Sequence, residues 1–147
     1  MNPDFVALLR ELSAAEARFI VVGAYAVTFH ARPRATGDLD LWIEATPANA
    51  ARVFRALRTF GAPLEDLSEA DLAQPDVVYQ IGVPPRRIDL LTTLAGLSFT
   101  EAWAGRVAGR FGELEVPFIG REALIRNKRA LGRPRDLADL ELLEPGA

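Results

Sequence analysis

The sequence contains no cysteine and only one histidine, His30. Without cysteine the chain cannot form disulfides, thiolate zinc sites or iron–sulfur centres, and it cannot use a thiol nucleophile. A single histidine cannot build a multi-histidine metal site. The chemistry that remains is that of carboxylates, hydroxyl groups and metal ions with oxygen ligands, such as Mg²⁺.

Long apolar runs and blocks of like charge are also absent. No segment approaches the roughly 18 apolar residues that a membrane span needs, and the N-terminus has no basic stretch followed by an apolar run. We therefore expect a cytoplasmic protein that does not contact a membrane. The net charge is −3, from 17 basic and 20 acidic residues, so any contact with nucleic acid has to be local.

The apolar content is sufficient for one buried core. Half of the 147 residues are hydrophobic, which predicts a single domain over residues 1–147. The pattern predicts an α/β (α+β) fold, with a mixed central sheet flanked by helices. Helices are expected at 3–16, 24–31, 47–60, 121–131 and 135–143, with short turns near Ser68 and at 101–104. Strands are expected at 19–22, 38–44, 77–82, 87–92, 106–111 and 114–119.

Asp38 and Asp40 are two residues apart on a predicted strand. Since side chains alternate along a strand, both carboxylates lie on one face, and a divalent cation is the usual way to keep two such neighbours ionised. The alternative is a half-exposed strand whose solvent face carries Asp38, Asp40, Trp42 and Glu44. The pair alone does not decide between these interpretations.

Asp89 interrupts the apolar strand at 87–92, where a lone buried carboxylate would be costly. If this strand lies beside the strand that carries Asp38, then Asp89 completes a three-carboxylate site for one or two Mg²⁺ ions. The alternative is an ion pair between Asp89 and either Arg86 or Arg87.

Gly23 follows a predicted buried strand and precedes a predicted helix. The free N–H groups and the positive dipole end of that helix could bind a phosphate, and a glycine leaves room for it to approach. A plain strand-to-helix turn explains the glycine equally well.

Five segments, in this order, resemble the DNA polymerase β-like nucleotidyltransferase superfamily. The similarity is to its minimal nucleotidyltransferases and to the abortive-infection (AbiEii-like) toxins of toxin–antitoxin pairs. The run from Arg34 to Ile43, with its arginine, threonine and two aspartates, is the most specific segment. The other segments are Phe19–Ala24, Arg87–Leu91, Leu124–Ala130 and Arg133–Leu140.

The resemblance implies a role for each matched acidic residue. Asp38 and Asp40 are implied to bind metal ions, Mg²⁺ or Mn²⁺. Asp89 is implied to complete the metal site and to help activate the acceptor hydroxyl.

The resemblance also implies nucleotide-binding residues. Gly23 and Ala24 are implied to line the triphosphate, and Arg34 and Thr36 belong to the same matched region. Ala24 departs from the family pattern of glycine followed by glycine or serine, which removes a hydroxyl that could bind a phosphate oxygen.

Lys128 is the only lysine among the 17 basic residues. It falls where the resembled proteins place a cation directed at phosphate; the alternative is an ordinary lysine on a solvated helix face. Residues 121–135 contain six basic side chains and one acidic one, which predicts a local positive patch toward nucleotide or RNA phosphate. A solvated helix pair explains the same composition.

Two functions of different classes follow. The first is a metal-dependent nucleotidyltransferase that moves a nucleoside monophosphate from an NTP to a hydroxyl of RNA, such as a tRNA, or of a protein. The resemblance adds a toxin role with an antitoxin partner. The second is a catalytically inactive protein of this fold that binds a nucleotide or a protein partner, an alternative favoured by Ala24. The sequence does not identify the NTP or the acceptor.

Overall fold

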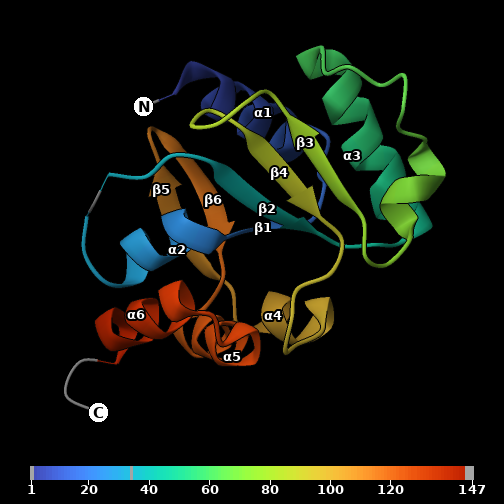
Figure 1. Ribbon diagram of the computed structural model, residues 1–147. Coiled ribbons are helices and arrows are strands. Elements are labelled where there is room, and N and C mark those ends of the chain that lie inside the picture. Colours follow the sequence, from blue (N-terminus) through green and yellow to red (C-terminus); the bar gives the residue numbers. More distant parts are fainter. Residues whose placement is uncertain (1, 34, 145–147) are drawn as a thin grey trace.

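A six-stranded mixed sheet lies at the centre of the computed structural model, which describes residues 2–33 and 35–144, and helices cover both of its faces (Figure 1). The strands are β1 (Phe19–Val22), β2 (Leu39–Ile43), β3 (Val78–Ile81), β4 (Ile88–Leu91), β5 (Val107–Phe111) and β6 (Leu114–Phe118). The helices are α1 (Pro3–Ala14), α2 (Gly23–His30), α3 (Pro47–Phe60), α4 (Phe99–Ala104), α5 (Arg121–Leu131) and α6 (Pro134–Leu143), with a 3₁₀ helix η1 (Glu69–Ala73).

The strand order is β3-β4-β2-β1-β6-β5. The central strands β1 and β2 are antiparallel, and each has a parallel neighbour on its other side, β6 and β4 respectively. The hairpins β3–β4 and β5–β6 complete the two edges. The predicted mixed α/β fold is confirmed, and each predicted helix and strand begins and ends within two residues of its observed bounds.

Local signals explain most of these boundaries, as α3 illustrates. The hydroxyl of Thr46 caps the helix by accepting a hydrogen bond from the N–H of Asn49 (3.2 Å), and Pro47 occupies the first turn. Gly61 ends the helix in the left-handed conformation, with φ of 93°.

No helix in residues 2–33 and 35–144 has the length and apolar character needed to cross a membrane.

Each face of the sheet packs against its own helices. Leu39 and Leu41 point into a core shared with α1 and α3. Ile20, Val22 and Trp42 point to the opposite face, where α2, α4, α5 and α6 cover them. Trp42 is only 2% exposed, so the interpretation of its face as a solvent-exposed one is wrong. Asp40, near the start of β2, therefore lies at the end of a helix-covered face.

Candidate active site

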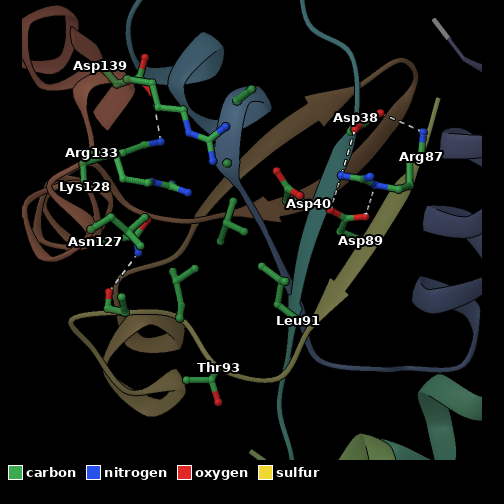
Figure 2. A pocket seen from close by; sticks show the side chains of 17 residues that line it. Asp38, Asp40, Arg87, Asp89, Leu91, Thr93, Asn127, Lys128, Arg133 and Asp139 are labelled. Atoms are coloured by element: carbon green, nitrogen blue, oxygen red, sulfur yellow. Dashed lines mark hydrogen bonds and ion pairs between the residues drawn. The ribbon is translucent and has the colours of Figure 1, made fainter. Parts of the chain in front are cut away.

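The parallel pairing of β2 with β4 brings two of the predicted acidic residues together. In this register Asp40 is paired with Asp89, so their side chains leave neighbouring strands on the same face (Figure 2). Asp38 lies on that face too, two residues before Asp40. Asp89 is 8% exposed, which makes this an acidic cluster at the edge of a buried layer.

Arg87 connects the remaining members of the cluster. Its guanidinium donates from Nε to Oδ1 of Asp89 (2.8 Å) and lies 3.4 Å from Oδ2 of Asp38. The backbone N–H of Arg87 also donates to Oδ1 of Asp38 (3.0 Å). The expected ion pair between Asp89 and Arg87 is therefore present, and the strands of Asp40 and Asp89 are neighbours, while the role of Asp89 in a metal site stays a prediction.

The crowding of carboxylates changes the acidity of Asp40. Burial, followed by the negative charges of Asp89 and Asp38, raises the pKa of Asp40 from 3.8 to about 6. A hydrogen bond with Asp89 acts in the same direction, and the positive charge of Arg87 opposes it. Asp40 thus holds a proton over a pH range in which an ordinary aspartate is ionised.

These residues suit a hard divalent cation in their donor chemistry. Asp40 and Asp89 offer adjacent carboxylate oxygens, the ligands that Mg²⁺ and Mn²⁺ prefer, and their mutual repulsion is what such a cation would relieve. Within the described residues, however, no three carboxylate or imidazole groups stand ready as a metal-ligand set. Asp38 and Asp89 are instead bound to the guanidinium of Arg87.

Gly23 is required where β1 passes into α2. Val22 pairs with Asp40 across the sheet, so the chain leaves β1 directly beside the Asp40 carboxylate. Gly23 has φ of 68°, in the left-handed region, and a Cβ atom there would overlap Oδ2 of Asp40 and lie 2.9 Å from its Cγ. This close approach explains the glycine better than a plain strand-to-helix turn does.

The acidic cluster forms one wall of a pocket of about 570 Å³. Gly23 and Ala24 line it at the start of α2, and basic side chains of α5 and α6 form the opposite wall (Figure 2). The basic residues of that wall are Lys128, Arg133 and Arg135. The rest of the lining is mainly uncharged and includes Leu91, Thr93, Leu94, Asn127 and Leu131.

Lys128 is 6% exposed, so the alternative of a solvated surface lysine is wrong. Its Nζ lies 3.0 Å from Oδ2 of Asp139 and 3.3 Å from Oδ1 of Asp136. Hydrogen bonds from Arg133 lower the pKa of Asp136 to about 2, with Lys128 acting in the same direction. The basic wall is therefore held in place by buried ion pairs between α5 and α6.

Two other basic residues of the range 121–135 form ion pairs away from the pocket. Arg126 pairs with Glu101 (3.0 Å) and Arg129 with Glu144, so those charges are compensated outside the pocket wall.

Thr36, which was predicted to bind the nucleotide, lies within 3.2 Å of the Thr28 hydroxyl and is not part of the pocket wall. Arg34 lies outside the described residues. The nucleotide roles of Thr36 and Arg34 remain predictions.

Four polar residues of the pocket, Arg87, Thr93, Asn127 and Asp139, were not predicted as site residues from the sequence. The sequence predicts Arg87 only as an ion-pair partner of Asp89, and it gives no pattern that singles out Thr93 or Asp139. The amide of Asn127 donates to the carbonyl of Ala95 (3.0 Å) from the buried side of α5. A usable signal was present, because Asn127 and Lys128 are polar residues near apolar Leu124 on the helix face that packs inward.

No protein-family model matches the sequence, and no curated protein matches it. Among solved structures, a candidate nucleotidyltransferase from Thermotoga maritima, TM1012, is similar with 12% identity and a TM-score of 0.61, over 96% of this chain and 92% of that one. The lincosamide antibiotic adenylyltransferase LnuA, with lincomycin bound, is similar with 13% identity and a TM-score of 0.63, over 100% of this chain and 98% of that one. The chain thus has the nucleotidyltransferase fold, and neither structure bears on the abortive-infection branch.

The close approach of Gly23 to Asp40 predicts a specific effect of Gly23→Ala. Gly61→Ala is the matched control, because Gly61 also has a positive φ but has no atom within 4 Å of an added Cβ. Backbone strain alone should lower the free energy of unfolding by about 1 to 2 kcal/mol in Gly61→Ala. Overlap with Asp40 should add about 1 to 3 kcal/mol in Gly23→Ala, measured by urea denaturation. Equal losses in the two variants would contradict the proposed contact.

The raised pKa of Asp40 predicts a dependence of stability on pH. Between about pH 4 and pH 6 the folded protein binds more protons at Asp40 than the unfolded chain does, so the free energy of unfolding falls as pH rises through this window and levels off above it. The loss is at most about 3 kcal/mol. The free energy of unfolding, measured for metal-free wild type and Asp40→Asn at several pH values, isolates the contribution of Asp40. A wild-type-minus-variant difference that does not change with pH would contradict the assignment.

Proposed function

We propose that the protein is a metal-dependent nucleotidyltransferase. The observation that carries the proposal is the pairing of Asp40 with Asp89 beside Gly23, at the acidic wall of a pocket whose opposite wall is basic. An NTP with its divalent cation has both kinds of charge, so a pocket with one acidic and one basic wall complements it.

The phosphates would lie between the start of α2 and the basic wall. Gly23 and Ala24 present the N-terminus of α2 to the pocket, and this helix has no side-chain cap at its N-terminus. Arg133, which caps the N-terminus of α6, and Arg135 in its first turn supply positive charge. Lys128 has three N–H donors, so an ammonium that contacts Asp136 and Asp139 can still offer one to a phosphate oxygen.

Asp38, Asp40 and Asp89 would hold Mg²⁺ or Mn²⁺, which supplies charge neutralisation at the phosphates when bound. In the transfer step the acceptor oxygen bonds to the α-phosphorus, the bond from that phosphorus to the bridging oxygen breaks, and pyrophosphate leaves. A carboxylate of the cluster, Asp89 in our assignment, takes the proton of the acceptor hydroxyl. The other residues position the reactants.

The acceptor is proposed as a hydroxyl of RNA, such as a tRNA, or of a protein side chain. The name of LnuA describes an adenylyltransferase of lincosamide antibiotics, so a lincosamide belongs among the acceptors to be tested. A toxin role and an antitoxin partner are supported by the sequence resemblance alone. Catalytic inactivity is the second candidate, since Ala24 lines the pocket without the hydroxyl of a serine.

The first test measures binding and transfer together. Saturating Mg²⁺ and NTP should raise the melting temperature of the wild type, and α-labelled NTP should transfer its label to RNA, protein or lincosamide. Asp40→Asn should abolish the metal-dependent rise and lower transfer by about 100-fold or more. Glu44→Gln is the matched control, because Glu44 follows the same strand but pairs with Arg18 outside the pocket (3.4 Å).

Three outcomes of this test separate the candidates. Labelled product that Asp40→Asn does not form supports the enzyme. Binding without transfer to any acceptor supports the inactive alternative. A wild-type melting temperature that neither metal nor NTP changes would contradict both the enzyme and the nucleotide-binding form of the inactive alternative.

A second test concerns Lys128. Lys128→Ala should weaken NTP binding by about 1.5 to 3 kcal/mol, the range for hydrogen bonds to charged groups. It should also lower the free energy of unfolding, because Asp136 and Asp139 lose a buried partner. Arg129→Ala removes the neighbouring charge, which pairs with Glu144, and should leave NTP affinity unchanged. If folded Lys128→Ala binds NTP as tightly as wild type, Lys128 has only a structural role.

A further inference from the structure

Arg87 holds a position that the proposed function does not yet explain. It lines the pocket, and its side chain is 28% exposed. Its Nε and Nη2 donate to the two oxygens of Asp89, at 2.8 and 3.3 Å, and Nη2 lies 3.4 Å from Oδ2 of Asp38. The guanidinium therefore contacts both carboxylates at once.

Among the described residues, the ion pairs of Asp38 and Asp89 both come from Arg87. Lys128 and Arg133 pair with acidic residues of α6, on the opposite wall. Asp38, Asp40 and Asp89 therefore have Arg87 as their neighbouring cation. A divalent cation bound by the same carboxylates would need oxygens that Arg87 now occupies.

We infer that Arg87 is the built-in counterion of the acidic cluster: it binds Asp38 and Asp89 in the nucleotide-free protein and has to release them before a divalent cation can bind. This inference rests on the proposed function, and it makes Arg87 a positioning residue that sets metal affinity by competition. Three carboxylates would otherwise repel one another with no cation present.

The backbone allows this release without loss of the site. The N–H of Arg87 donates to Oδ1 of Asp38 (3.0 Å), and the carbonyl of Arg87 accepts from the N–H of Leu39 (3.0 Å). These two bonds fix Asp38 relative to β4 through main-chain atoms. Removing the guanidinium by substitution therefore leaves the orientation of Asp38 supported, so a variant tests the charge itself.

Arg87→Met removes the charge and keeps an unbranched apolar side chain. Arg86→Met is the matched control, because Arg86 is the exposed neighbouring arginine and does not line the pocket. We expect Mn²⁺, titrated without nucleotide by calorimetry and electron paramagnetic resonance, to bind Arg87→Met about tenfold more tightly than wild type, the size expected when two partly exposed ion pairs no longer compete. Metal-free Arg87→Met should melt at a lower temperature than wild type, and Arg86→Met should match wild type in both measurements.

A merely structural role would not tighten metal binding, so the direction of the change decides. If wild type binds Mn²⁺ and Arg87→Met binds it equally or more weakly, the counterion role is wrong while the metal site of the proposed function stands. If neither protein binds Mn²⁺ alone, the counterion role is wrong, and the melting temperature with Mg²⁺ and NTP together decides separately on the proposed function. If Arg87→Met does not fold, Arg87→Gln and Arg87→Lys replace it: tighter Mn²⁺ binding by Gln than by Lys supports the counterion, and the reverse order overturns it.

Discussion

Repulsion among three carboxylates is the constraint on which the site depends. The register of β2 and β4 forces Asp40 beside Asp89, and the alternation of side chains adds Asp38 to the same face. The sheet holds them there although the burial and charge of this position raise the pKa of Asp40 to about 6. Such an arrangement costs stability, and the divalent cation that we propose would offset this cost when bound.

Two other features of the chain follow from this constraint. Gly23 lacks a side chain because the carboxylate of Asp40 occupies the space that a Cβ would need. Arg87 contacts Asp38 and Asp89 because the metal-free cluster needs a positive charge. On the far wall Lys128 is paired in turn with Asp136 and Asp139, so each wall contains its own ion pairs and the two walls face each other across the pocket.

Much of the fold could be predicted because its signals are local. Thr46, Pro47 and Gly61 mark the ends of α3 within the sequence itself, and the period of two placed Asp38 and Asp40 on one face. The burial of Trp42 was harder to predict. Only the helices that pack over it show that its face is buried, and they are distant in the sequence. The alternation of polar and apolar residues along β2 is the same whether water or a helix covers that face.

The site was predictable in its acidic residues and less so in its ion pairs. Asp89 could be placed beside Asp40 only on the assumption that their strands are neighbours, because the register joins residues 49 positions apart. Lys128 was expected either to bind phosphate or to be solvated, whereas its carboxylate partners come from the next helix and bury it. Pairings of this kind depend on how helices pack, which no local pattern contains.

A crystal structure with Mn²⁺ and a non-hydrolysable NTP analogue, with an anomalous difference map, tests the central claim most directly. We predict a Mn²⁺ peak within coordination distance of the Asp40 and Asp89 carboxylates, the triphosphate between Gly23 and the basic wall, and Arg87 released from Asp38. A Mn²⁺ peak elsewhere, or a nucleotide bound with the Arg87 bridge intact and no metal beside Asp40, would contradict it.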